Sequence, residues 1–515
     1  MYLAVSIHFL GWLAIGFLLY QWFPLKSPGK GALSIGLGWP ISQALVLLII
    51  YVSPLRLSET GIIVASIFII IFGFCAHRLF AGKRGRIHPD ISVPNAFSLL
   101  QNWLFALLLF VIVLHLWVHS TNHVSDLIFP WDAFTTWIYR AKAWVLADQI
   151  LSFGSPLAWL SGDLSDQYVL YATHYPEGVS LLSAFSATLT GSWDDRVATL
   201  PWLILFVALG CLVFGICRAI GQPKVISVAA AYLTLSCPLV STHTSLAGYA
   251  DLWLVLFSGC GLTCLLAGRI GRRNDLLLIG FLLLFVSTQL KFEGWIWLSL
   301  GTVFILLDLL GANFGYLKCT VVAIGIIFFL ILADMNHLSF GPLGVFGVIQ
   351  NRLYVGPFGD FPVRLFNPFY LYFKTLWLSP NFHTLAPLYL GSSMILLLKD
   401  PGKAAPVWLM GAMILLSQGL IFGASVFSIY AETGTAFNRL ILHFLPVITL
   451  TVALAISAIT FESDPRSTDL AFCNDRNATT QPNKPSYNLI IAIILTKHNF
   501  ATTLPQRLPL KVPHD

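Results

Sequence analysis

The sequence predicts an all-α, polytopic transmembrane helix bundle. Of its 515 residues, 57% are hydrophobic and only 10% are charged, a balance that a soluble domain of this size does not show. Its apolar runs reach the roughly 20 residues that cross a bilayer as a helix. We expect about 13 to 14 spans, together with two large outer loops that carry interfacial helices.

The predicted spans follow one another along most of the chain, with boundaries set by the apolar runs. They lie near residues 3–23, 33–53, 60–80, 98–119, 199–218, 225–241, 250–268, 275–290, 294–311, 317–334, 384–398, 405–424 and 437–460. The first run has no basic leader and no small-residue cleavage site, so we expect a retained helix. The stretch 178–191 is about fourteen residues long, which predicts a short or re-entrant helix covered by protein at its ends.

Three regions are expected. Residues 1–97 carry N-terminal transmembrane helices, and residues 98–460 form the main transmembrane domain. Within that domain, the long connections 120–175 and 335–383 are the two outer loops. Residues 461–515 form a polar tail whose single apolar stretch is too short to span a bilayer, and we expect this tail to be largely disordered.

The basic residues predict how the bundle is oriented, because Lys and Arg resist translocation. With one crossing at each predicted span, the basic clusters of the short loops fall on one side: Lys26, Lys30, Arg78, Lys83, Arg84, Arg86, Arg218, Lys224, Arg269, Arg272, Arg273, Lys399 and Lys403. The outer loops then face the extracytoplasmic side of an inner (plasma) membrane. The net excess of six positive charges is spread over short loops, so we expect no nucleic-acid partner.

The cysteines and histidines predict no metal site. Eight cysteines are scattered through apolar runs without a CxxC pair, and the histidines are not clustered at the spacing of metal ligands. We expect packing roles for the cysteines and no cofactor, with a divalent metal left open.

Five polar segments stand out because ionisable groups at membrane depth are costly and usually functional. They are WDAFTTWIYRAKAW (131–144), HYPEG (174–178), GYAD (248–251), KFEG (291–294) and AFNRL (436–440). The predicted spans place all five at the outer side of the bundle. This convergence predicts a functional site there.

The first segment has the spacing of an amphipathic helix. Asp132, Thr136 and Arg140 share one face, whereas Trp137 and Trp144 share another, together with Ala141. We interpret it as an interfacial helix with its tryptophans at the headgroup level. Asp132 follows a proline at the helix start, where favourable interaction with the helix dipole is an alternative explanation for an acid.

The other charged residues also have structural explanations. Asp251, Glu293 and Arg439 lie at span ends, from which charged side chains can extend to the interface. Lys291 and Glu293 are two residues apart and do not face each other on a helix, so a local ion pair is not expected unless a non-helical turn joins them. His174, beside a Tyr-Pro pair, is explained equally well as a simple loop residue.

The order of these segments resembles a known family. WDAF..W...AKA, then HYP, GYAD, K.EG and a late R.....LP (Arg439 to Pro446) resemble bacterial integral-membrane glycosyltransferases of the GT-C fold. These enzymes are relatives of the protein O-mannosyltransferases and of the enzymes that transfer aminoarabinose to lipid A. The resemblance covers residues 98 to 450, lies in the order of five weak motifs, and makes 98–460 a GT-C-like catalytic domain.

The resemblance implies an inverting transfer of a sugar from a polyprenyl-phosphate donor to a hydroxyl of a glycan, lipid or protein acceptor. It implies that Asp132 is the general base, that cations bind the donor phosphate, and that aromatic and imidazole groups line the substrate. The implied phosphate-binding cations are Lys291 and Arg439, then Arg140 and Lys142, and the implied lining residues are His174, Tyr175 and Tyr249.

The chain departs from the family where many relatives carry a second acid directly after the first. Here Ala133 follows Asp132, so a second acid has to come from elsewhere in the sequence. Glu177, Asp251 and Glu293 are the candidates.

Other functions remain open. A secondary transporter or a flippase of lipid-linked glycans would also gather acids near the membrane. We find no internal repeat, however, and the candidate residues lie at span ends rather than at mid-membrane, where alternating access places its sites. A polymerase or ligase of surface polysaccharide would share the lipid-linked donor.

Overall fold

A computed structural model describes most of the chain up to residue 461. The described residues are 2–22, 29–52, 99–125, 128, 130–162, 168–170, 172–173, 175–314, 338–339, 345–349, 352–355, 360–362, 373–378, 380–382, 384–423 and 435–461. Met1–Thr460 form one compact unit, to which the following description refers. The predicted spans 60–80 and 317–334 and the predicted tail beyond residue 461 lie outside the described residues.

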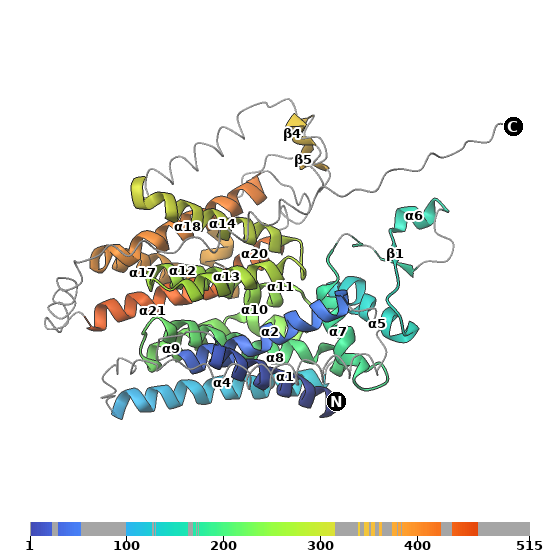
Figure 1. The fold of residues 1–515 in the computed structure, drawn as a ribbon, viewed down its shortest axis with the longest axis horizontal. Helices are drawn as coiled ribbons and strands as arrows, with labels where there is room; N and C mark the ends of the chain where they lie inside the picture. Colours follow the sequence, from blue (N-terminus) through green and yellow to red (C-terminus); the bar gives the residue numbers. More distant parts are fainter. Residues whose placement is uncertain are drawn as a thin grey trace. The chain divides into compact units, whose positions relative to one another are not determined.

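The unit is a helical bundle (Figure 1), and among the described residues five helical segments are long and apolar enough to cross a membrane. They are α1 (Tyr2–Trp22), α2 (Lys30–Val52), α4 (Leu99–Ser125), α8 (Asp195–Ala219), and the continuous run of α11 (Asp251–Leu254), η2 (Val255–Gly259) and α12 (Cys260–Ile270). The expectation of a multi-pass membrane protein is met at this level. The described spans are fewer than the predicted 13 to 14.

A bent helix pair would make a sixth span if its two halves cross the membrane together. The predicted span 225–241 forms two helices, α9 (Lys224–Leu235) and α10 (Pro238–Ser245), whose axes differ by 61°. Pro238 is the first residue of α10. A proline has no N–H for the helical ladder and disfavours helical geometry in the residue before it, so the break falls at this position.

The other helices of the bundle are shorter or end near undescribed segments. They are α7 (Gly178–Thr188), α13 (Asn274–Ser287), α14 (Glu293–Phe314), α17 (Leu385–Lys399), α18 (Pro401–Gly423), α20 (Thr435–Leu442) and α21 (Leu445–Phe461). The structure confirms that the stretch 178–191 forms a short helix, because α7 has 11 residues and all of them are buried. Protein covers this helix, as its length requires.

Small residues bring α2 and α8 close together at the centre of the bundle. A Cβ atom added to Gly36 would lie 2.6 Å from the Leu212 backbone, and one added to Gly215 would lie 2.6 Å from the Leu33 backbone. Without side chains at these two positions, the backbones approach as they do in tightly packed membrane helices.

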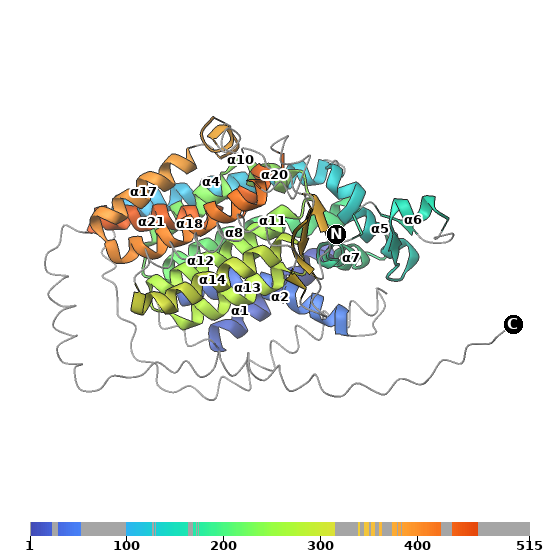
Figure 2. The same ribbon diagram turned by 90° about the horizontal axis from the view of Figure 1, so that it is seen from above.

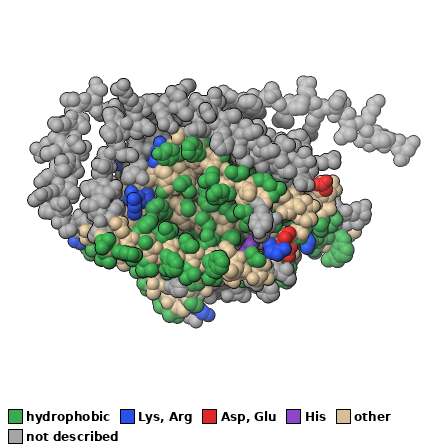
Figure 3. Space-filling model, turned by 90° about the horizontal axis from the view of Figure 1, so that it is seen from below, with side chains coloured by type: hydrophobic (Ala, Val, Ile, Leu, Met, Phe, Trp, Pro, Cys, Tyr) green, Lys and Arg blue, Asp and Glu red, His purple; other side chains and the backbone are tan. Residues whose placement is uncertain are grey.

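Helix α4 presents its apolar side chains outward. None of its most hydrophobic 18-residue window is buried, which suits contact with lipid. Its polar exceptions point inward: His119 Nδ1 lies 2.8 Å from Ser245 Oγ, and His123 Nε2 donates to the Arg196 carbonyl over 2.7 Å. The space-filling view in Figure 3 shows hydrophobic side chains across the middle of one face of the molecule and charged side chains toward its margins.

The segment predicted as the first outer loop, 120–175, packs on the bundle in its described part. It contains η1 (Ala133–Trp137), α5 (Ile138–Ala147), α6 (Pro156–Leu160) and a parallel pair of short strands, β1 (Phe153–Gly154) and β2 (Tyr168–Val169). Trp137 and Trp144 are 2% and 0% exposed and belong to the hydrophobic core, whereas Trp131 is 70% exposed. The predicted headgroup position of Trp137 and Trp144 is therefore wrong, because both pack against protein.

The segment predicted as the second outer loop, 335–383, is not purely helical. Its described part forms an antiparallel sheet in the order β3 (Leu338–Ser339), β4 (Val345–Ile349), β5 (Arg352–Val355), β6 (Asp360–Pro362), followed by η5 (Lys374–Leu378) and η6 (Pro380–Phe382). The paired strands VFGVI and RLYV are rich in β-branched and aromatic residues, which favour strands. The prediction of interfacial helices is wrong in this part of the loop.

The basic residues of the short loops and the polar segments of the candidate site lie at opposite ends of the bundle. The run from Asp251 to Ile270 has 20 residues, about 30 Å of helix, and it places Asp251 and Arg269 at opposite ends. At the Arg269 end, Arg273 Nη1 donates to the Ala219 carbonyl over 2.8 Å, joining the end of α8 to the turn between α12 and α13. Figures 1 and 2 show α5, α11 and α20 toward one end and α17 toward the other.

Candidate functional site

Asp132 and Arg439 form an ion pair although 307 residues separate them in the chain. Asp132 lies in the first turn of the helical stretch before η1, and Arg439 lies in α20. The Arg439 guanidinium donates from Nη1 to Asp132 Oδ2, and the side chains are 27% and 29% exposed, respectively. The Asp132 carboxylate makes no capping hydrogen bond, so its local helix does not account for its position.

Asp251 lies directly behind this pair. It is the first residue of α11 and is 1% exposed. Its Oδ1 accepts from Lys291 Nζ over 2.9 Å, and its Oδ2 lies 3.5 Å from Arg439 Nη1. Burying a carboxylate so completely requires cationic or hydrogen-bonding partners, which Lys291 and Arg439 supply.

Lys291 also pairs with Glu293. Its Nζ lies 2.9 Å from Glu293 Oε1. The pair was expected only if a non-helical turn joined the two residues, and Lys291 does lie in the non-helical turn between α13 and α14. The turn is tight at Gly294, where an added Cβ would lie 2.3 Å from the Ser287 carbonyl oxygen. Lys291 therefore joins two buried carboxylates.

His443 and Trp297 complete the buried part of the cluster. Trp297 Nε1 donates to His443 Nδ1 over 3.1 Å, and His443 Nε2 lies 3.4 Å from Asp251 Oδ1. A neutral imidazole that accepts at Nδ1 carries its proton on Nε2, the atom that faces Asp251. Sequence analysis missed both residues, although His443 lies four positions after Arg439, a spacing that shares a helix face.

Two close backbone approaches fix the segments against each other. Gly248 has a φ of +122°, and a Cβ there would lie 2.3 Å from the Ala133 Cβ. This contact explains the alanine after Asp132, because a larger side chain at position 133 would meet the GYAD turn. Gly178 packs equally tightly on the 289–290 backbone and donates its N–H to the Gln289 carbonyl over 3.1 Å.

The remaining predicted cations lie away from the ion-pair cluster. Arg140 is 2% exposed, and its guanidinium donates to the carbonyl oxygens of Tyr175, Pro176 and Ala172 over 3.2, 3.4 and 3.5 Å. It holds the segment before α7. Lys142 is exposed and lies over the Trp193 ring, with Nζ 5.6 Å from its centroid.

The predicted lining residues are partly in place. Tyr249 lies under the Arg439 guanidinium, 5.5 Å from Cζ to the ring centroid, and stacks on His243. Tyr175 packs on Trp137 with ring centroids 5.2 Å apart. Glu177 is half-buried and precedes α7. His174 lies outside the described residues.

Burial and neighbouring charges shift the pKa values of several side chains at the site. Burial, opposed by Arg439, raises the pKa of Asp132 above its ordinary value of 3.8. Burial alone would lower the pKa of Lys291, but Asp251 and Glu293 outweigh it, so the pKa is raised and the amine stays charged. Burial, with the nearby Glu293, raises the pKa of Tyr175 to about 12. Burial thus favours the protonated form of the partly accessible Asp132 carboxyl.

The described part of the chain contains no group of three or more His, Cys, Asp and Glu side chains arranged to hold a metal ion. The structure instead joins Asp132, Asp251, Lys291, Glu293 and Arg439 into one network of ion pairs. Comparison with known proteins gives no further guide, since no protein-family model, no curated protein and no solved structure matches this chain.

Proposed function

We propose that this protein is a membrane glycosyltransferase of the GT-C type. It moves a sugar from a polyprenyl-phosphate donor to an acceptor hydroxyl at the extracytoplasmic face of the inner membrane, with inversion at the anomeric carbon. The observation that carries the proposal is the accessible Asp132–Arg439 pair above the buried network. A carboxylate and a guanidinium side by side are the two groups that this reaction needs.

In the proposed reaction, Asp132 accepts the proton of the acceptor hydroxyl while the hydroxyl oxygen attacks the anomeric carbon. The new bond forms between that oxygen and carbon as the bond from the carbon to the phosphate oxygen breaks. The phosphate leaves with the bonding electron pair. Arg439 stabilises the negative charge that develops on it, since a guanidinium matches phosphate oxygens in charge and geometry.

The buried residues hold this pair in place. Lys291 is 6% exposed and lies between two carboxylates, so we assign it to Asp251 rather than to the donor phosphate. Asp251 in turn lies against Arg439. As the second acid of the site, Asp251 positions the cation and does not contact the substrate.

The test is turnover in detergent, where no ion gradient exists. Purified protein is incubated with a polyprenyl-phosphate sugar and a hydroxyl acceptor, and released polyprenyl phosphate is measured. We expect Asp132→Asn to abolish turnover while the protein stays folded. Asp194→Asn is the matched control, because Asp194 also pairs with an arginine and its side chain is 32% exposed. Full activity of Asp132→Asn would exclude Asp132 as the base.

One observation favours a second candidate, a proton-coupled transporter. Three carboxylates, Asp132, Asp251 and Glu293, meet two cations, Lys291 and Arg439, in the described network, and an excess carboxyl can carry a proton. Substrate-dependent proton uptake into proteoliposomes without sugar transfer would support transport. Turnover in detergent would support the enzyme.

A further inference from the structure

Arg439 has one fixed and one exchangeable carboxylate partner. Both bind at the same nitrogen, Nη1, which donates to Asp132 and lies 3.5 Å from Asp251 Oδ2. Asp251 is 1% exposed and is also held by Lys291. Asp132 is accessible, and among the described residues Arg439 is its only ion-pair partner. The outer partner can leave without exposing a buried charge.

The rest of the Arg439 guanidinium has no hydrogen-bond partner among the described residues. The Nε and Nη2 atoms of Arg439 make no hydrogen bond to any residue that the structure describes. The Tyr249 ring lies 5.5 Å from Cζ, a contact that favours the cation and restricts its orientation. The Nε–Nη2 edge of a guanidinium presents two parallel N–H donors, which match two oxygens of a phosphate.

We propose that Arg439 exchanges partners during the reaction: a phosphate anion binds its Nε–Nη2 edge and weakens the pair with Asp132, which releases that carboxylate to act as the base. The proposal rests on the proposed function for its choice of anion. It adds an order of events, in which the donor binds before the acceptor loses its proton.

The charges give the reason for this order. While Asp132 is paired with Arg439, the guanidinium stabilises the carboxylate and makes it a weaker base. An anion on Arg439 takes up part of that positive charge, so Asp132 becomes the stronger proton acceptor. Binding free energies are reciprocal. Removing the negative charge of Asp132 must therefore strengthen anion binding at Arg439.

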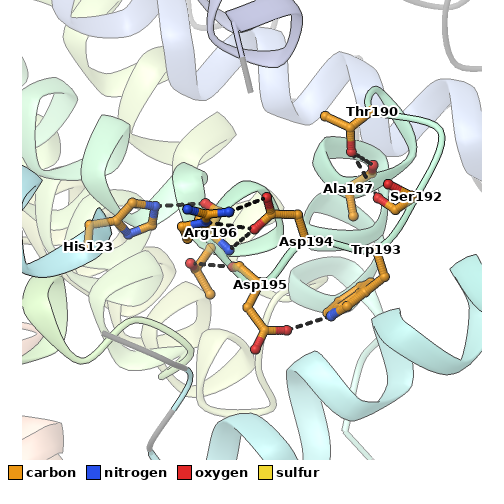
Figure 4. Close-up of polar contacts among 9 residues, drawn as sticks. His123, Ala187, Thr190, Ser192, Trp193, Asp194, Asp195 and Arg196 are labelled. Carbon is orange, nitrogen blue, oxygen red and sulfur yellow. Dashed lines mark hydrogen bonds and ion pairs between the residues drawn. The ribbon is translucent and has the colours of Figure 1, made fainter. Parts of the chain in front are cut away.

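A comparable pair lies elsewhere on the same unit and serves as the control. Figure 4 shows Asp194 and Arg196 at the start of α8. The Asp194 carboxylate accepts two hydrogen bonds, from Nε and Nη2 of Arg196, each over 3.1 Å. In this pair the arginine edge is already occupied. We therefore expect Asp194→Asn, with the same change in net charge, to leave anion binding at Arg439 unaltered.

The experiment measures anion affinity directly, without turnover. A water-soluble short-chain prenyl monophosphate, and separately inorganic phosphate, are titrated by calorimetry into the full chain in phosphatidylcholine nanodiscs. We expect D132N and D132S to bind the prenyl phosphate about 3- to 10-fold more tightly than the wild type. R439K, which keeps the charge but loses the two-donor edge, should bind about 10-fold more weakly.

The outcomes separate the two proposals. Unchanged or weaker binding by both D132N and D132S would overturn the exchange, even if the wild type transfers sugar. Tighter binding by these variants, with no sugar transfer by the wild type, would support the exchange and overturn the proposed function. The same gain with inorganic phosphate would show that Arg439 recognises the phosphate group alone, whereas a gain confined to the prenyl compound would show that the lipid chain is needed to reach it.

Discussion

Replacing Lys291 with methionine tests the buried network most directly. The Lys291 Nζ lies 2.9 Å from both Asp251 Oδ1 and Glu293 Oε1, and the three side chains are 7%, 1% and 9% exposed. After the change, Asp251 keeps Arg439 at 3.5 Å, but Glu293 keeps no ion-pair partner among the described residues. Leaving a buried charge unpaired costs about 3–5 kcal/mol, and we expect Lys291→Met to lower the free energy of unfolding by that amount.

The second arm of the experiment removes the carboxylate charge of Glu293, which Lys291→Met leaves unpaired. Glu293→Gln alone should cost about 1 kcal/mol, because Lys291 keeps Asp251. In the double variant Lys291→Met/Glu293→Gln, no unpaired carboxylate remains at position 293. The double variant should therefore be more stable than Lys291→Met alone, with a coupling free energy of about 2 kcal/mol or more.

The assay is reversible unfolding in mixed micelles, followed by tryptophan fluorescence, with all four proteins under the same conditions. A Lys291→Met protein no less stable than Glu293→Gln would refute the reasoning. Strictly additive effects in the double variant would refute it as well, since they would mean that Lys291 and Glu293 do not interact.

Three further predictions concern Asp132 and two residues, Arg140 and Gly248, that hold the neighbouring segments in place. Because burial raises the pKa of Asp132 above 3.8, and a base works only when deprotonated, the transfer rate should fall as the pH drops through that raised value; a rate unchanged down to pH 3.8 would contradict this. Arg140→Lys should cost about 2–4 kcal/mol of unfolding free energy, because lysine cannot donate to three carbonyls in the same fork, and equal stability would exclude a holding role. Gly248→Ala, at φ +122° and against Ala133, should lower transfer about 10- to 100-fold by shifting Asp132, whereas Gly162→Ala, at φ +82° in open space, should leave the rate unchanged.

The sequence was informative where local composition decides the outcome. The apolar runs predicted the long helices, and the shortness of the 178–191 stretch predicted α7. The five polar segments contain Asp132, Asp251, Lys291, Glu293 and Arg439, which the structure joins. A Lys291–Glu293 pair was expected only in a non-helical turn, and the structure shows it there. The headgroup position predicted for Trp137, the last residue of the π-helix η1, was wrong because this side chain packs against protein.

Membrane spans follow from the sequence because each depends on the transfer of its own side chains into lipid, a nearly additive local property. Which side chains contact each other does not follow from the sequence, because it depends on which helix faces meet. Only the tertiary structure brings Arg439 to Asp132 across 307 residues, places His443 and Trp297 behind Asp251, and sets Gly248 against Ala133. The charged residues were visible in the sequence, but their roles depend on burial and on the neighbours that packing supplies.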